Sequence, residues 1–103
     1  MEYFRVFAND SLSNPIKVLK PDKVVAAGTE YRQDIWIQNF SGNELADIIL
    51  YSDDKDVSFE PKLILSMKDM EVVKVVVVWK PPVDREKPLS TKVLADFNVI
   101  RRA

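Results

Sequence analysis

Acidic side chains gather in the polar segment 52–56 and could supply oxygen ligands to a calcium ion. Asp53, Asp54 and Asp56 lie close together, and Glu60 follows shortly after them. Calcium binds six to eight oxygens, and an EF-hand loop places a glycine and a distal glutamate at fixed positions. This segment has neither residue at those positions, so a solvated acidic turn is the stronger interpretation.

A second pair of carboxylates, Glu30 and Asp34, could do acid–base chemistry if burial or a neighbouring charge displaced the pKa of one of them. The chain contains no histidine and no cysteine. These absences remove the commonest general base, the commonest metal ligand and every thiol nucleophile. We therefore expect a protein that is not an enzyme and that needs no metal or cofactor.

The charged segment 81–88 is the best candidate for a recognition loop. It reads Pro-Pro-Val-Asp-Arg-Glu-Lys-Pro, so that Asp84, Arg85, Glu86 and Lys87 stand between prolines. Loops on rigid scaffolds often carry function, and prolines reduce the conformational entropy that is lost on binding. The alternative is a charged connector that has no partner.

Trp36 is the candidate aromatic anchor for a protein partner. The two-residue strand period places Ile35 and Ile37 toward a core and Trp36 on the opposite, more polar face. Tryptophan is enriched at interface hot spots, but coverage of this side chain by loops of the same domain or by Arg32 is the stronger interpretation. Trp36 and Tyr51 could also bind a carbohydrate by stacking, provided that both rings are exposed and coplanar.

Length and charge narrow the class of protein further. The chain has 103 residues, 47% of them hydrophobic, and a formal net charge of −1. This predicts a single domain over residues 1–103 with a substantial core. The balanced charge provides no long-range field for nucleic acid or for an anionic membrane.

Targeting signals are not evident in the sequence. The first residues have no basic segment followed by an apolar one, and no apolar run approaches the ~20 residues that span a bilayer. A cytoplasmic or virion-associated location is therefore favoured. Asn39-Phe40-Ser41 matches the N-glycosylation pattern. Because no export signal is evident, we interpret this match as a coincidence.

The segment 72–79 is the strongest strand signal, because it is mostly valine and ends at two prolines. Similar patterns predict strands over 3–8, 31–38, 45–51, 57–59, 63–67 and 93–100, with shorter extended segments over 16–19 and 24–27. Strict alternation is expected in 63–67, and Val93, Ala95, Phe97 and Val99 are expected to point inward. Seven or eight short strands without a helix predict an all-β, immunoglobulin-like antiparallel sandwich.

Four stretches in series carry a resemblance to known sandwich modules. They are Gly28–Tyr31 leading into Ile35–Asn39, then Phe40–Leu45, then Val57-Ser58-Phe59-Glu60-Pro61, then Met70–Pro82. Over roughly residues 24–100 their order is similar to immunoglobulin-like domains of the CARDB, major-sperm-protein and pilus-chaperone type. The resemblance implies a non-catalytic adaptor, spacer or assembly subunit. No motif specific to the pilus chaperones is present, so their activity is not implied.

The expected function is therefore structural: a subunit of an assembly such as a virion, tail or surface layer. The first alternative is a monomeric adaptor that binds another protein through an edge strand, Trp36 or the loop 81–88. The second alternative is a carbohydrate-binding module. The expected partner is protein, either a further copy of the chain or another protein, and no small-molecule substrate is expected.

Overall fold

The computed structural model describes residues 3–85 and 87–100. Seven strands form within them, and the described residues contain no helix, and hence none that could cross a membrane. The strands are β1 (Phe4–Phe7), β2 (Tyr31–Asn39), β3 (Glu44–Ser52), β4 (Val57–Glu60), β5 (Leu63–Met67), β6 (Val72–Trp79) and β7 (Val93–Ile100). The predicted all-β class is confirmed.

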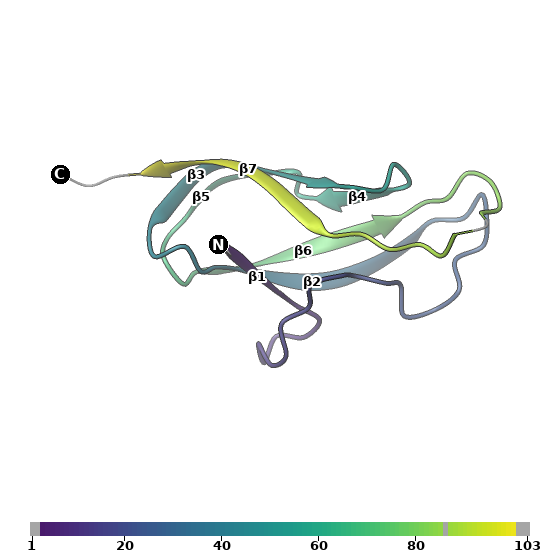
Figure 1. Ribbon diagram of the computed structural model, residues 1–103, viewed down its shortest axis with the longest axis horizontal. Coiled ribbons are helices and arrows are strands. Elements are labelled where there is room, and N and C mark those ends of the chain that lie inside the picture. Colours follow the sequence, from purple (N-terminus) through teal and green to yellow (C-terminus); the bar gives the residue numbers. More distant parts are fainter. Residues whose placement is uncertain (1–2, 86, 101–103) are drawn as a thin grey trace.

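Two antiparallel sheets pack face to face as a sandwich. One has the strand order β1-β2-β6-β4 and the other the order β5-β3-β7, and Figure 1 shows β3 and β7 as the layer above β2 and β6. The valine-rich strand β6 lies between β2 and β4, as its two largely apolar sides predict. An interior position keeps its main-chain groups paired on both sides and withholds them from other chains.

The core lies between the sheets and follows the two-residue period. Ile35 and Ile37 on β2 are fully buried, and so are Val75, Val77 and Trp79 on β6. The other sheet contributes Leu45, Ile48, Leu50 and Met67, which are at most 1% exposed. Each sheet therefore places one of its faces in the core.

Strict alternation fails in β3 and β5, contrary to the sequence prediction for 63–67. Met67 and Ile64 are both buried although three residues separate them, while Leu63 and Leu65 are exposed. The irregularity arises in the neighbouring strand β3. Its register with β7 shifts between Ala46 and Ile49, and Asp47 has a φ of 51°. A bulge of this kind inserts one residue and exchanges the faces of those that follow.

The last strand and the first connections are as follows. Val93, Ala95 and Phe97 pack against the core as predicted, and Val99 pairs with the buried Leu45 on the inner side of the sheet, although Val99 itself is 39% exposed. The segments 16–19 and 24–27 form no strand. Leu19 instead makes a single bridge to Thr91, with hydrogen bonds of 2.8 and 3.0 Å between their main chains. This bridge ties the first part of the chain to the segment that leads into β7.

Candidate interaction surfaces

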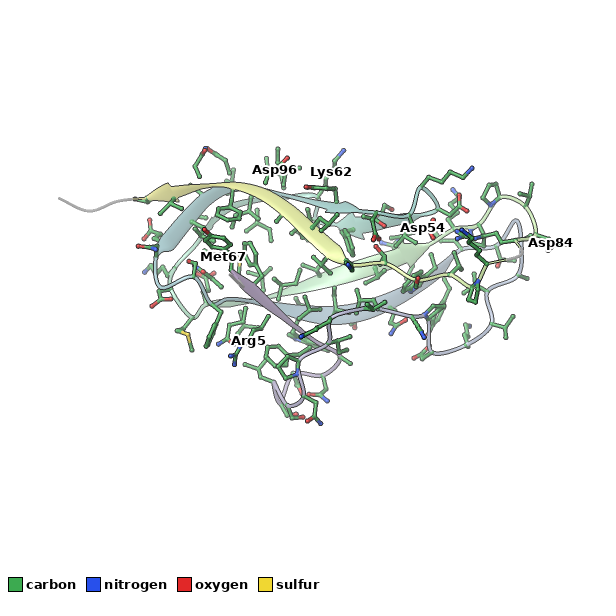
Figure 2. The ribbon with its side chains drawn as sticks, in the orientation of Figure 1. Arg5, Asp54, Lys62, Met67, Asp84 and Asp96 are labelled. Atoms are coloured by element: carbon green, nitrogen blue, oxygen red, sulfur yellow. The ribbon has the colours of Figure 1, made fainter. Side chains whose placement is uncertain are left out.

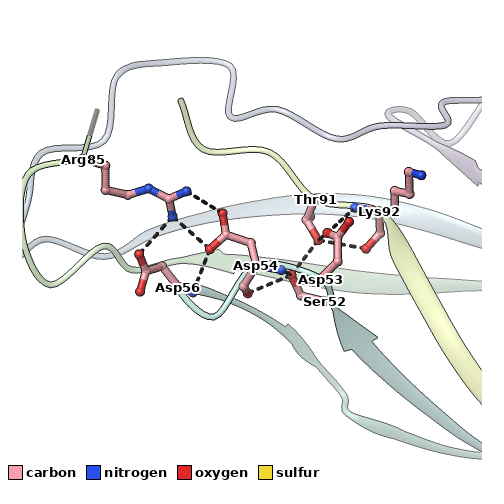
Figure 3. Close-up of polar contacts among 7 residues, drawn as sticks. All are labelled: Ser52, Asp53, Asp54, Asp56, Arg85, Thr91 and Lys92. Atoms are coloured by element: carbon pink, nitrogen blue, oxygen red, sulfur yellow. Dashed lines mark hydrogen bonds and ion pairs between the residues drawn. The ribbon is translucent and has the colours of Figure 1, made fainter. Parts of the chain in front are cut away.

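Arg85, in the predicted recognition loop, binds two carboxylates of the acidic segment. Its Nη2 lies 2.8 Å from Asp54 Oδ2, and its Nη1 donates to Asp54 Oδ1 and to Asp56 Oδ2, both at 2.9 Å (Figure 3). The side chains of Asp54 and Asp56 are only 12% and 8% exposed. Hydrogen bonding to Arg85 holds the pKa of Asp54 below its usual value. The arginine therefore fastens the loop to the sandwich.

Asp53 is also used within the chain. Its Oδ1 accepts hydrogen bonds of 3.1 Å from the main-chain N–H of Lys92 and from Thr91 Oγ1 (Figure 3). The Lys92 N–H is the main cause that lowers the pKa of Asp53. Asp54 and Asp56, considered above as calcium ligands, thus bind Arg85, and Asp53 binds the residues just before β7. No group of three acidic ligands within 3–85 and 87–100 is arranged to hold a metal ion.

A groove of about 570 Å³ separates the loop from the segment 20–27. Its lining is mainly proline, valine and alanine, and Lys20, Lys23 and Lys87 add positive charge. Val24 and Val83 on its walls are 94% and 66% exposed. Only the loop side of this groove was predicted from the sequence. The apolar run at 24–27, which enters no strand, is the signal for the other side.

The remaining predicted loop residues differ in their placement. Asp84 and Lys87 are exposed and line the groove, whereas Arg85 is part of the contact with Asp54. Glu86 lies outside the described residues. Binding of a partner by these side chains stays a prediction.

Trp36 and the loop 81–88 do not form a single site. It lies on β2 opposite Phe7 of β1 and Lys74 of β6, and it is half-buried while Phe7 is 3% exposed. Trp36 and Tyr51 belong to different sheets, so their rings form no shared platform for a sugar. A role of Trp36 alone in partner binding stays a prediction.

The outer face of the four-stranded sheet carries paired charges. Lys74 Nζ lies 3.4 Å from Asp34 Oδ2, and Arg32 forms ion pairs with both Glu30 and Glu60. Glu30 and Asp34, considered above for acid–base chemistry, are therefore exposed members of surface ion pairs. Ion pairs of this kind are screened by solvent and are typical of a solvated face.

The outer face of the three-stranded sheet is apolar in contrast. Ile49 and Tyr51 on β3 are each 42% exposed, and Leu63 and Leu65 on β5 are 49% and 73% exposed. Ile49 pairs with Leu63 across the sheet, and Tyr51 pairs with the half-buried Leu94 of β7. We call this set of five side chains the apolar face. Its residues come from three strands, and the bulge at Asp47 decides which of them point outward.

Both sheets have open edges, which the sequence left unassigned. They are β1 and β4 in one sheet and β5 and β7 in the other. With eight residues β7 is the longest of the four, and Asp96 is its one ionisable side chain. A long edge with little charge is a site where a further strand can add.

Asn39 is a structural residue. Its side chain is fully buried, and Nδ2 donates to the carbonyl oxygens of Asn43, Met67 and Lys68 at 2.7, 3.1 and 3.0 Å. A glycan cannot be attached to this nitrogen in the folded protein, because the nitrogen is enclosed by the chain. The pattern Asn39-Phe40-Ser41 therefore describes a turn, in which the Ser41 N–H and hydroxyl donate to Asn39 Oδ1.

Comparisons with known proteins return no relative. No protein-family model matches the chain, and no curated protein or solved structure matches it either. What the structure establishes is an all-β antiparallel sandwich of two sheets, with an apolar outer face on one of them and a groove at one end.

Proposed function

We propose that this chain is a non-catalytic structural subunit that associates with further copies of itself in a protein assembly. The observation that carries the proposal is the contrast between the two outer faces. One bears surface ion pairs such as Lys74–Asp34. The other bears Ile49, Tyr51, Leu63 and Leu65 with 42–73% of each residue exposed.

The apolar face suits association better than solvation. Antiparallel sheets that face water normally alternate apolar inward with polar outward residues. Here outward positions on β3 and β5 are apolar, and neighbouring ones are cross-strand partners. The contiguous surface amounts to roughly a few hundred Å², the size at which a patch is often functional. Association removes this surface from water and is favoured for that reason.

The sandwich type belongs to the same proposal. We assign the chain to the immunoglobulin-like class, in which one sheet has the order of first, second, fifth and fourth strands. The order β1-β2-β6-β4 follows this scheme if β5 is an added strand beside β3. This assignment supports a scaffold role, because domains of that class commonly present interaction surfaces on a rigid frame.

Light scattering behind a sizing column, over a range of protein concentrations, tests the proposal. We expect the mass to rise above the 11.8 kDa of one chain as the concentration increases. A mass that stays at one chain up to millimolar protein would contradict a self-assembling subunit.

A second candidate function, a monomeric adaptor, is favoured by the groove between 20–27 and the loop. Its walls expose Val24 and Val83, and its lining carries three lysines. In the described part of the chain, the main-chain N–H groups of Val24, Val25 and Ala26 donate to no other main-chain group. An extended segment of another protein could pair with them.

The adaptor candidate is tested by a pull-down in which the wild type is compared with Val24→Asp/Val83→Asp and with Trp36→Ala. Loss of the captured protein in the double variant alone would locate binding at the groove, and loss in Trp36→Ala alone would locate it on β2. Circular dichroism checks that every variant is folded. Binding that survives both changes would refute both sites.

A further inference from the structure

The apolar face is centred on a row of three paired residues. Ile49 of β3 pairs with Leu63 of β5 on one side and with Asp96 of β7 on the other. Directly opposed residues in antiparallel strands project from the same side of a sheet. The row therefore runs from the β5 edge to the β7 edge with isoleucine at its middle.

Opposite charges stand at the two ends of this row. Lys62 immediately precedes Leu63 at the β5 edge, and Asp96 occupies the β7 edge. Figure 2 shows the Lys62 and Asp96 side chains on the outer side of the three-stranded sheet. Both residues are exposed, and no ion pair involving either is found among the described residues. The row thus has an apolar centre, a cationic end and an anionic end.

This arrangement is complementary to a second copy of itself. A two-fold axis parallel to the strands and running between two stacked sheets reverses the strand order of the partner sheet. The β5 edge of each copy then lies over the β7 edge of the other, while Ile49 lies over Ile49. Lys62 of each copy meets Asp96 of the second copy, so two ion pairs form around one apolar centre.

We propose that the apolar face is a two-fold dimer interface in which Lys62 and Asp96 pair between copies across stacked Ile49 residues. The inference rests on the proposed self-assembly and names the surface and symmetry that it uses. Sheets that stack with nearly aligned strands pack in this way in sandwich cores.

The charges at the two edges disfavour the other stacked arrangement. A two-fold axis perpendicular to the strands would place each β5 edge over β5 and each β7 edge over β7. Lys62 would then face Lys62, and Asp96 would face Asp96. Like charges opposed at an interface oppose association and select against wrong partners. The axis parallel to the strands is the one that the surface charges favour.

The size of the face sets the expected strength. Stable interfaces bury about 800 Å² on each partner, and the apolar face offers less than that. The dimer is therefore reversible, and its mass depends on concentration. In an assembly with several such contacts, the high effective concentration of neighbouring copies would compensate for a weak single contact.

Charge reversal tests the interface by sedimentation equilibrium of the full chain. Lys62→Glu and Asp96→Lys should each weaken dimerisation about tenfold, because each creates two like-charge contacts. The double variant, Lys62→Glu with Asp96→Lys, should restore the dimer to near wild-type strength. Lys74→Glu with Asp34→Lys, the matched exchange on the opposite face, should change nothing.

Leu65→Lys provides an independent test of the apolar centre and should abolish the dimer, whereas Val24→Lys, at a residue 94% exposed near the groove, should not. Circular dichroism checks the fold of every variant. A dimer that the double charge exchange fails to restore, or that the matched controls weaken equally, would overturn the interface and leave self-assembly standing. A wild-type chain of 11.8 kDa at millimolar concentration would overturn both.

Discussion

Arg85 and Asp54 form a two-point contact, with Nη1 donating to Oδ1 at 2.9 Å and Nη2 lying 2.8 Å from Oδ2. The two residues are 31 positions apart, so their contact joins the loop after β6 to the turn between β3 and β4. A planar guanidinium matches a carboxylate in this way, and an ammonium group does not.

Replacement of Arg85 should therefore loosen the loop without unfolding the sandwich. Arg85→Ala should increase amide hydrogen exchange in the loop about tenfold or more, because the hydrogen bonds to Asp54 and Asp56 are lost. Arg85→Lys should fall close to Arg85→Ala, since lysine cannot make the two-point contact. Lys87→Ala is the control. Exchange rates in Arg85→Lys equal to those of the wild type would show that charge alone holds the loop.

Acid should weaken the same contact. The pKa of Asp54 lies below its ordinary value of 3.8 in the folded protein, mainly through Arg85. The stabilisation is therefore complete above about pH 4. It is lost as the pH falls through the lowered folded pKa, because the unfolded chain takes up the proton more readily. We expect the free energy of unfolding, measured by urea denaturation, to fall below pH 4.

Asp54→Asn should reduce this acid dependence, because an amide does not titrate. Asp84→Asn, at an exposed loop position, should leave the dependence as it is. Some dependence should remain in Asp54→Asn, since the pKa of Asp53 is also lowered, chiefly by the Lys92 N–H. Equal slopes in Asp54→Asn and in the wild type would contradict the assignment to Asp54.

Asn39 should be among the most sensitive positions of the fold. Asn39→Asp replaces a buried donor to three carbonyl groups with a group that cannot donate when ionised. We expect a loss of about 3 kcal/mol or more in the free energy of unfolding, since buried polar groups would be left unpaired. Asn9→Asp is the matched control, because Asn9 is exposed and its Oδ1 only accepts a bond from Ser11. A small loss at Asn39 would mean that water replaces the missing donor.

Substitution of Asp47 tests whether the backbone at the bulge is strained. The residue's φ of 51° is costly for a β-branched side chain and costs glycine little. Asp47→Val should lower the free energy of unfolding by about 1–2 kcal/mol, whereas Asp47→Gly should stay within about 0.5 kcal/mol of the wild type. Both variants lose the hydrogen bond from Asn98 Nδ2, so their difference isolates the backbone. Equal stabilities in denaturant would argue against a strained residue here.

The fluorescence of the two tryptophans should differ in its sensitivity to a quencher. Trp79 is fully buried, and its Nε1 donates to Gln33 Oε1 at 3.2 Å, while Trp36 is half-buried on the outer side of β2. Acrylamide should therefore quench mainly Trp36. Trp36→Phe should leave a weakly quenched protein. Strong quenching of that variant would show that Trp79 is reached by solvent.

Local periodicity predicted the strands and most of their inward residues. The alternation in β2 directed Ile35 and Ile37 to the core, where the structure buries them, and the valine run predicted β6 without deciding which of its faces is inward. These are properties of neighbours along one strand, where side chains alternate by geometry. The prolines after Trp79 likewise ended the strand at the residue where it ends.

The sequence did not predict which outward residues together form a surface. The bulge at Asp47 exchanges the inward and outward positions of the residues after it. The pattern of apolar and polar residues does not indicate where the extra residue is inserted. The partner of Arg85 lay in a turn far away in the chain, and the groove required 20–27 to lie beside 81–89. These relationships depend on how the two sheets and their connections pack, which no local pattern specifies.

The sequence by itself determined the class of fold and narrowed the chemistry. A chain with alternating strands and closing prolines favours a β-sandwich, and a chain without histidine and cysteine offers no imidazole and no thiol for chemistry. Only the tertiary structure decided where charge and apolar surface lie. It set the registers that align Leu63, Ile49 and Asp96 in one row, because pairing between strands is a long-range choice made by packing of the whole core.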